Sequence, residues 1–246
     1  MTGGRALVSV YADESCLGNG RDGDNPGGAG VLIEFRRPGS AELVRHDLWV
    51  SEPATTNNRM ALRSVITAMA ALGAKGASLD VVFTTDSRYI VDGMTSWVHG
   101  WARRGWTRKG GAIENLGLWG EAIRAAQAHA VRWEWVRGHD GHAQNEYANH
   151  LAMRAAADQT SSDGIVPSAF EAWDAAARAR GARHAGQREQ RRRERKQEFQ
   201  RQLGLVAALG LSVVFAVFIA NARTIAAQEA RNQLLNSENA KLDVQD

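Results

Sequence analysis

The N-terminal two thirds of this 246-residue chain have little cysteine and no excess of charge of either sign. A single cysteine, Cys16, excludes an internal disulfide framework and is typical of a chain that folds in a reducing compartment. Residues 1–160 carry about 17 basic and about 17 acidic side chains, so their charges cancel. The net charge of +3 therefore does not predict a broad electropositive surface on this part of the chain.

One later segment lacks charge altogether. Residues 203–222 hold no charged side chain, and about 20 helical residues cover a hydrocarbon core of roughly 30 Å. This predicts a single membrane-spanning helix, the alternative being a buried core helix, for which too little chain follows. Because Lys and Arg crowd the N-terminal flank, we expect the N-terminal part in the cytoplasm and residues 223–246 outside, in the periplasm if the cell is bacterial.

The residues before this segment predict a long helix. Residues 168–202 hold few helix breakers and many Ala, Arg, Glu and Gln residues. Seven basic side chains between Arg188 and Arg201 would lie over anionic lipid head groups. Residues 159–167 contain Ser, Asp, Gly and Pro and predict a linker, so we expect the compact domain to cover residues 1–158.

The compact domain shows the periodicities of an α/β fold. Three strands in direct succession indicate an antiparallel meander, and later strands alternate with helices. The order predicts a five-stranded mixed sheet flanked by helices. The expected strands are 6–12, 27–35, 41–50, 79–85 and 131–136, and the expected helices are 59–72, 87–98, 116–129 and 145–157.

Four motifs resemble, in order, those of type 1 ribonuclease H. They are Tyr11-Ala-Asp-Glu-Ser-Cys-Leu-Gly-Asn19, Thr55-Thr-Asn-Asn-Arg-Met60, Thr84-Thr-Asp-Ser87, and Trp135-Val-Arg-Gly-His-Asp-Gly-His142 followed by Asn145 and Glu146. The resemblance covers about residues 6–157. It implies a ribonuclease H-like fold, and an activity in which clustered carboxylates hold two divalent ions that promote cleavage of RNA in RNA/DNA hybrids.

The resemblance also implies that the carboxylate set is incomplete. It matches Asp13 and Asp86 to metal ligands and His139 to a loop histidine that assists proton transfer or product release. Ala61 and Asn149 stand where two further acids are expected. Losing two anionic ligands must weaken metal binding, so we expect no catalysis and no cofactor, or Mg²⁺ or Mn²⁺ if some activity remains.

A neighbouring acid could replace a missing ligand. Glu14 is expected on the opposite face of the strand from Asp13, because side chains alternate along a strand. Asp140, beside His139, is therefore the best candidate, and each acid is alternatively an ordinary solvated residue. The acids considered are Glu14, Asp22, Asp24, Asp92 and Asp140.

Two further groups of residues match substrate contacts in the family. Asn19, Asn57 and Asn58 match residues that contact 2′-hydroxyl groups and the minor groove, although such residues equally cap helices and fix loops. Residues 97–109 resemble a basic protrusion that grips the DNA strand, although tryptophans at helical spacing are also typical of a core. Its cations, expected to be exposed, are Arg103, Arg104, Arg108 and Lys109.

Three functions fit these features. We expect an accessory or structural subunit of an integral membrane complex, because this explains both the incomplete site and the predicted span. The alternatives are a nucleic-acid-binding module at the membrane, which would bind RNA/DNA hybrid weakly, and a residual metal-dependent ribonuclease H.

Overall fold

A computed structural model describes residues 6–18, 25–37, 39–138 and 140–242 of the chain. Within the last range it describes only the backbone of residues 203–216, 218, 230 and 233–242. The chain divides into two compact units, Met1–Arg178 and Ala179–Asp246.

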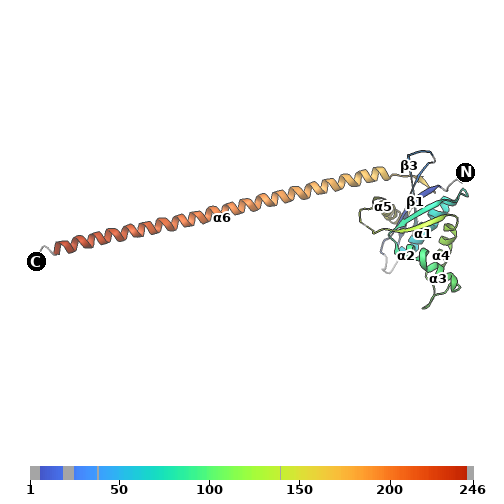
Figure 1. Ribbon diagram of the computed structural model, residues 1–246, viewed down its shortest axis with the longest axis horizontal. Coiled ribbons are helices and arrows are strands. Elements are labelled where there is room, and N and C mark those ends of the chain that lie inside the picture. Colours follow the sequence, from blue (N-terminus) through green and yellow to red (C-terminus); the bar gives the residue numbers. More distant parts are fainter. Residues whose placement is uncertain (1–5, 19–24, 38, 139, 243–246) are drawn as a thin grey trace. The chain divides into compact units, whose positions relative to one another are not determined.

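A six-stranded mixed sheet forms the centre of the first unit (Figure 1). The strands lie in the order β5-β4-β1-β2-β3-β6. Strand β1 is central, antiparallel to β2 on one side and parallel to β4 on the other. The strands are β1 (Leu7–Cys16), β2 (Gly27–Arg36), β3 (Leu43–Glu52), β4 (Asp80–Thr85), β5 (Ala130–Trp135) and β6 (Val166–Pro167).

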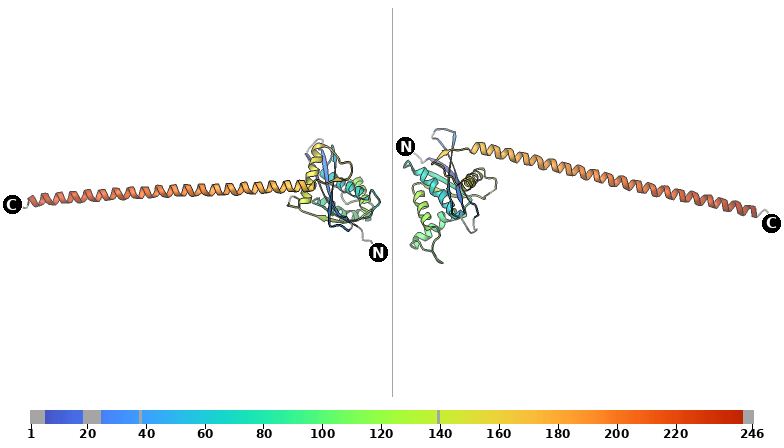
Figure 2. Two further views of the ribbon diagram at one scale, coloured as in Figure 1. Left: turned by 90° about the horizontal axis from the view of Figure 1, so that it is seen from above. Right: turned by 180° about the vertical axis from the view of Figure 1, so that it is seen from behind.

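Helices cover both faces of this sheet (Figure 2). Helix α1 (Asn57–Gly73) packs on one face with α4 (Leu116–Ala126) beside it, and α5 (Ala143–Asp158) packs on the other face. The mixed α/β architecture expected from the sequence is therefore confirmed. Three short helical segments follow β4, namely α2 (Arg88–Asp92), the π-helical turn η1 (Gly93–Trp97) and α3 (Val98–Arg103).

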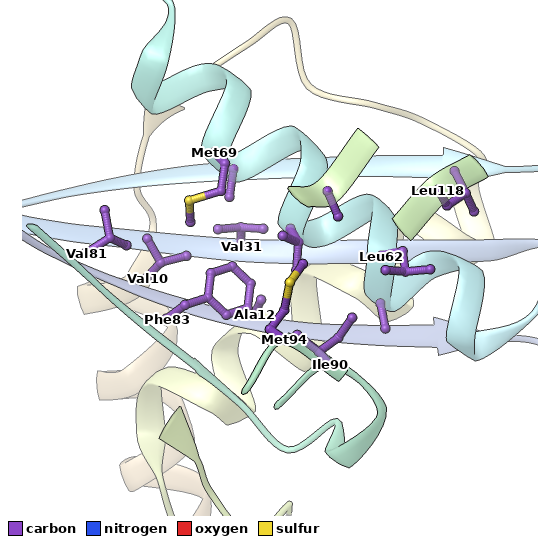
Figure 3. Close-up of a cluster of buried hydrophobic side chains, with 14 of the residues drawn as sticks. Val10, Ala12, Val31, Leu62, Met69, Val81, Phe83, Ile90, Met94 and Leu118 are labelled. Atoms are coloured by element: carbon purple, nitrogen blue, oxygen red, sulfur yellow. The ribbon is translucent and has the colours of Figure 1, made fainter. Parts of the chain in front are cut away.

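Alternation along β1 divides its side chains between two cores. Val8, Val10 and Ala12 face α1 and belong to the larger cluster, where Figure 3 shows Val10 and Ala12 beside Phe83 of β4. Tyr11 points to the other face, toward α5, and packs against the smaller cluster. The side chains of the next two residues, Asp13 and Glu14, therefore leave the strand on opposite faces of the sheet.

Two glycines of β2 let α5 approach the sheet closely. A Cβ atom on Gly28 would lie 2.3 Å from the carbonyl oxygen of Ala152, and one on Gly30 would lie 2.2 Å from that of Ala148. A Cβ atom cannot lie so close to a backbone oxygen, so this spacing between α5 and β2 requires glycine at both positions. The close approach sets α5 against β1 and β2.

Residues 159–167, expected to be a linker, are instead part of the first unit. Gln159 ends α5 in the left-handed conformation, with φ of 50°, and the chain returns to β3. There the hydroxyl of Ser162 accepts a hydrogen bond from the Trp49 amide at 3.1 Å, and β6 pairs with β3. The expected five-stranded sheet was one strand short, because a two-residue strand has no periodicity that a sequence could reveal.

Helix α6 (Phe170–Leu242) contains most of the predicted helical segment 168–202. Its exposed side chains form pairs at i, i+4 spacing, such as Arg193 with Glu189 at 3.1 Å. The predicted membrane span, residues 203–222, falls mostly on side chains outside those described. Among the residues that were described, none of the helices combines the length and apolar character needed to cross a membrane.

Candidate active site

Three carboxylates meet where β1 and β4 stop pairing. The last paired residues are Ala12 and Thr85, so Asp13 and Asp86 follow at the same edge of two parallel strands. Single carboxylate oxygens of Asp13, Glu14 and Asp86 all lie within 4.8 Å of one another. The expected proximity of Asp13 and Asp86 is therefore found, and Glu14 joins them.

The expectation that strand alternation keeps the Glu14 carboxylate away from Asp13 is wrong. Glu14 does continue the α1 face of Val8, Val10 and Ala12, while Asp13 begins on the α5 face. However, β4 no longer pairs with β1 beyond Ala12, and the Glu14 side chain hydrogen-bonds to Ser87, which follows β4. A glutamate side chain is long enough to reach past the end of a neighbouring strand, which the alternation rule does not take into account.

Ala61 and Asn145 complete the surroundings of this carboxylate cluster. Ala61 of α1 is fully buried in the larger core, on the face from which Glu14 starts. Asn145 of α5 is also buried, and its side-chain amide donates a hydrogen bond to Asp13 Oδ2 at 3.2 Å. This contact comes from Asn145, one turn before Asn149, and the assignment of Asn149 to the position of a family acid stays a prediction.

Burial and mutual repulsion disfavour the ionised forms of this cluster. Burial, followed by the charge of Asp86, raises the pKa of Asp13 to about 7, although hydrogen bonds from the Glu14 amide and Asn145 oppose the shift. Burial, followed by the charges of Asp13 and Asp86, raises the pKa of Glu14 to about 8. A nearby cation would offset this repulsion and favour the ionised forms.

These raised pKa values predict how stability depends on pH without metal. Unfolded carboxyl groups ionise near pH 4, so between about pH 4 and 8 the folded chain binds more protons than the unfolded chain. In EDTA, the free energy of unfolding contributed by this cluster should therefore fall as the pH rises through that window. Urea unfolding of the parent and of Glu14→Gln at several pH values measures the effect. A difference between the two proteins that stays constant from pH 5 to pH 8 would contradict it.

The donor set fits a magnesium or manganese ion. Both ions prefer oxygen ligands, and three carboxylates converge here. Two buried oxygen atoms, Glu14 Oε2 and Asn145 Oδ1, have no hydrogen-bond partner among the described residues. Buried oxygen atoms without a partner are rare and call for a partner outside the described residues, and a bound cation would be such a partner.

The loop after β5 closes against the same cluster. A Cβ atom on Gly138 would lie 2.2 Å from Asp86 Oδ2, so the loop backbone packs directly on this carboxylate. The indole N–H of Trp135 donates to the Asp86 carbonyl at 3.0 Å. His139, which follows Gly138, lies outside the described residues.

The other expected site residues divide into described and undescribed positions. Asn19, Asp22 and Asp24 lie outside the described residues. Asp140 is exposed, and Asp92 is half-buried within 4.0 Å of Arg88, so neither belongs to the carboxylate cluster. Among the asparagines before α1, Asn58 is exposed, whereas Asn57 has a buried Oδ1 atom without a partner among the described residues.

The segment after α3 combines core tryptophans with exposed cations. Trp101 and Trp119 are buried. The Trp119 ring packs directly on Gly93, because a Cβ atom on Gly93 would lie only 2.0 Å from the Cη2 atom of Trp119. Trp97 and Trp106 remain partly exposed. The expectation of core tryptophans is therefore confirmed for Trp101 and Trp119, and contact of this segment with a DNA strand stays a prediction. All four cations of the segment are exposed, as expected: Arg103, Arg104, Arg108 and Lys109.

Comparison with known proteins agrees with this geometry. A family model described as RNase H matches residues 5–157. Ribonuclease H of Pectobacterium carotovorum subsp. carotovorum (strain PC1) is 41% identical over 160 residues, which are 65% of this chain and 96% of that protein. Ribonuclease H of Erythrobacter litoralis (strain HTCC2594) is 45% identical over 150 residues, 61% of this chain and 95% of that protein.

Solved structures show the same relationship. The crystal structure of LC9-RNase H1, described as a type 1 RNase H with the type 2 active-site motif, is 71% identical with a TM-score of 0.66, and the match covers 69% of this chain and 81% of that chain. The solution structure of the PFV RNase H domain is only 16% identical with a TM-score of 0.53, and so shares the fold. Through its N-terminal domain, this chain belongs to the ribonuclease H family.

Proposed function

We propose that this chain is a metal-dependent ribonuclease H that cleaves the RNA strand of RNA/DNA hybrids. The observation that carries the proposal is the position of Glu14, whose carboxylate joins those of Asp13 and Asp86. The expectation of an inactive protein depended on a count of two carboxylates, and the count is three. Relatives that match nearly their full length are named ribonuclease H, which supports activity over an accessory role.

The carboxylate cluster and two residues beside it, Asn145 and Gly138, have different roles in this proposal. Asp13, Glu14 and Asp86 would hold Mg²⁺ or Mn²⁺, and bound ions of this kind activate water and stabilise the leaving oxygen of a phosphodiester. Asn145 fixes one oxygen of Asp13 by hydrogen bonding, and its own amide oxygen is buried without a partner among the described residues. Gly138 lets the loop backbone approach Asp86 and narrows the site on that side.

The departure from the type 1 pattern does not argue against activity. Ala61 provides no ligand, but it is fully buried on the face from which Glu14 reaches the cluster, so one carboxylate replaces another. A solved relative with 71% identity is itself described as a type 1 RNase H with the type 2 active-site motif. A carboxylate set that differs from the usual type 1 set therefore has a precedent close to this chain.

The full-length chain, incubated with a labelled RNA/DNA hybrid, tests the proposed function. With Mg²⁺ or Mn²⁺ we expect cleavage of the RNA strand alone, and with EDTA we expect none, because the cluster cannot act without its ions. Asp13→Asn, which keeps the shape of the side chain, is the control for a contaminating nuclease. Cleavage by the parent chain no faster than by Asp13→Asn would contradict the proposal.

The location of the protein remains a separate proposal that rests on the sequence. Residues 203–222 lack charge, and the basic side chains of Arg188–Arg201 precede them, which supports a single-pass anchor with the N-terminal domain in the cytoplasm and contacts to anionic lipid and an integral membrane complex. Flotation of cell membranes tests it. We expect the full chain to float with the membranes and a chain lacking 203–222 to stay behind. A full chain that stays behind would exclude the anchor.

A further inference from the structure

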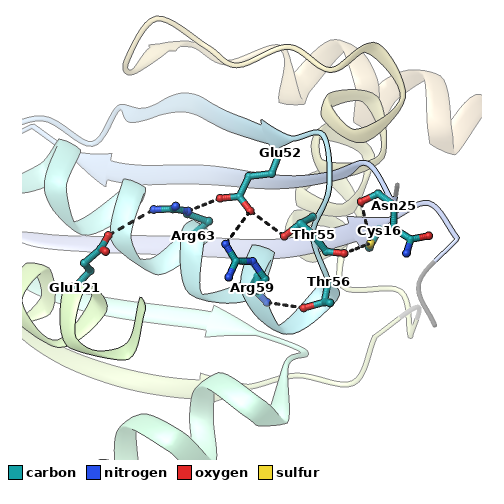
Figure 4. A network of polar contacts seen from close by, with 8 residues as sticks. All are labelled: Cys16, Asn25, Glu52, Thr55, Thr56, Arg59, Arg63 and Glu121. Atoms are coloured by element: carbon teal, nitrogen blue, oxygen red, sulfur yellow. Dashed lines mark hydrogen bonds and ion pairs between the residues drawn. The ribbon is translucent and has the colours of Figure 1, made fainter. Parts of the chain in front are cut away.

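Thr55 ties the end of β1 and the β1–β2 connection to the turn that precedes α1 (Figure 4). Its amide donates to the Asn25 carbonyl at 3.0 Å, at the end of the connection between β1 and β2. Its carbonyl oxygen lies 3.5 Å from Cys16 Sγ, at the end of β1, and the same sulfur lies 3.7 Å from the Asn25 carbonyl oxygen. Thr55 also begins the turn that leads through Thr56, the N-cap of α1, to Asn57.

The side chain of Thr55 is fixed in turn by Glu52. The Thr55 hydroxyl donates to Glu52 Oε2 at 2.8 Å, and Thr55 itself is buried. The space around it is tight, because a Cβ atom on Gly27 would lie 2.3 Å from Thr55 Cγ2. Thr55 therefore has one favourable rotamer in this structure, and Glu52 provides the polar partner of that rotamer.

Glu52 is itself held by two arginines of α1. Arg63 Nε donates to Glu52 Oε1 at 2.6 Å, and Arg59 lies 3.7 Å from Oε2. Arg63 also contacts Glu121 of α4 at 3.4 Å, so this network continues to a second helix. Burial opposes ionisation of Glu52, but hydrogen bonds from Arg63 and Thr55 outweigh it and hold the pKa of Glu52 below its usual value.

The network ends beside a group that is ready to accept a hydrogen bond. Asn57 follows Thr55 by two residues, and its Oδ1 atom is buried with no partner among the described residues. A hydroxyl donor from outside the protein would satisfy it, and the 2′-hydroxyl of RNA is such a donor. The orientation of Asn57 depends on the turn that Thr55 begins, and hence on Glu52.

We propose that Glu52 is a positioning residue for substrate recognition, which holds the Thr55–Asn57 turn in place to bind the RNA strand of the hybrid. The inference rests on the proposed ribonuclease H function and adds to it the residue that maintains substrate affinity. Glu52 takes no part in holding metal, since its contacts run to Thr55, Arg59 and Arg63 rather than to the carboxylate cluster. Its loss should affect binding of the hybrid, and not the chemical step.

Full-length Glu52→Gln and Thr55→Val are the variants that test this inference. Each keeps the shape of the side chain and weakens or removes the contact between residues 52 and 55. We expect KM for a labelled hybrid to rise about tenfold, the usual effect of one lost polar contact, while kcat changes less than about twofold. Hybrid affinity measured in EDTA by fluorescence anisotropy should weaken by a similar factor. Thr55→Ser, which retains the hydroxyl, should stay close to the parent.

Glu34→Gln is the matched control. Glu34 also accepts a hydrogen bond from an arginine Nε at 2.6 Å, from Arg45, but it joins β2 to β3 away from the turn. Glu34→Gln should lower the melting temperature about as much as Glu52→Gln does, and it should leave KM unchanged. A Glu52→Gln variant that folds and keeps the parent KM and affinity would overturn the inference, as would a loss confined to kcat. If the parent neither cleaves nor binds the hybrid, the proposed function fails first, and this inference fails with it.

Discussion

Glu14→Gln should lower kcat for hybrid cleavage by on the order of a hundredfold or more, since a neutral amide replaces a charged ligand in the reacting site. The carboxylate of Glu14 lies with those of Asp13 and Asp86, and a glutamine keeps one oxygen but loses the charge. The measurement is single-turnover cleavage of a labelled hybrid over a range of Mg²⁺ concentrations. We also expect the half-saturating Mg²⁺ concentration to rise.

The same variant should not unfold the protein. Burial and the charges of Asp13 and Asp86 raise the pKa of Glu14 to about 8, so removing its charge relieves repulsion when metal is absent. In EDTA at pH 8 the melting temperature of Glu14→Gln should therefore equal or exceed that of the parent. A large loss of activity without a loss of stability is the result that separates a ligand from a structural residue.

Asp140→Asn is the matched control for Glu14→Gln. Asp140 is exposed and lies outside the carboxylate cluster, although the sequence favoured it as the substitute ligand. We expect this variant to keep most of the parent kcat. Normal cleavage by Glu14→Gln together with loss of cleavage by Asp140→Asn would mean that Asp140, and not Glu14, completes the site.

Ending the chain after Asp158 should destabilise the domain by several kcal/mol compared with ending it after Arg178. The shorter chain loses β6 and Phe170, which is only 6% exposed and packs against Tyr147 at a centroid distance of 5.3 Å. The truncation also removes the Ala169 amide, which donates a hydrogen bond at 3.1 Å to the carboxylate of Asp47, a residue only 3% exposed. Loss of a buried aromatic ring alone costs about 3 kcal/mol or more.

Urea unfolding of point variants in the full chain measures this contribution without truncation. Phe170→Ala should lower the free energy of unfolding of the N-terminal unit by about 3 kcal/mol. Phe199→Ala is the matched control, because Phe199 lies in the second unit and is 64% exposed, so its loss should change stability by less than about 0.5 kcal/mol. Equal stability of the chains ending at Asp158 and Arg178 would contradict this contribution and support the expectation that residues 159–167 are a linker.

The sequence by itself determined the fold class and the place of the site. Apolar alternation at period 2 marked the main strands, and helical periodicity marked α1, α4 and α5, because both patterns come from side chains that face a core. Asp13 and Asp86 could be placed together because they come directly after the residues with which two adjacent parallel strands end their pairing, in a fold that four motifs indicated. Residues 203–222 were singled out by the absence of charge, and this remains a proposal about location.

Only the tertiary structure decided which side chains complete the site. Glu14 reaches Asp13 and Asp86 because the pairing of β1 with β4 ends at Ala12. Alternation along one strand does not predict where a neighbouring strand ends. Asn145 contacts Asp13 because Gly28 and Gly30 let α5 approach the sheet, which depends on packing between segments more than 100 residues apart. Local periodicity records the face on which a side chain begins, whereas the position of its functional end depends on neighbours from distant parts of the chain.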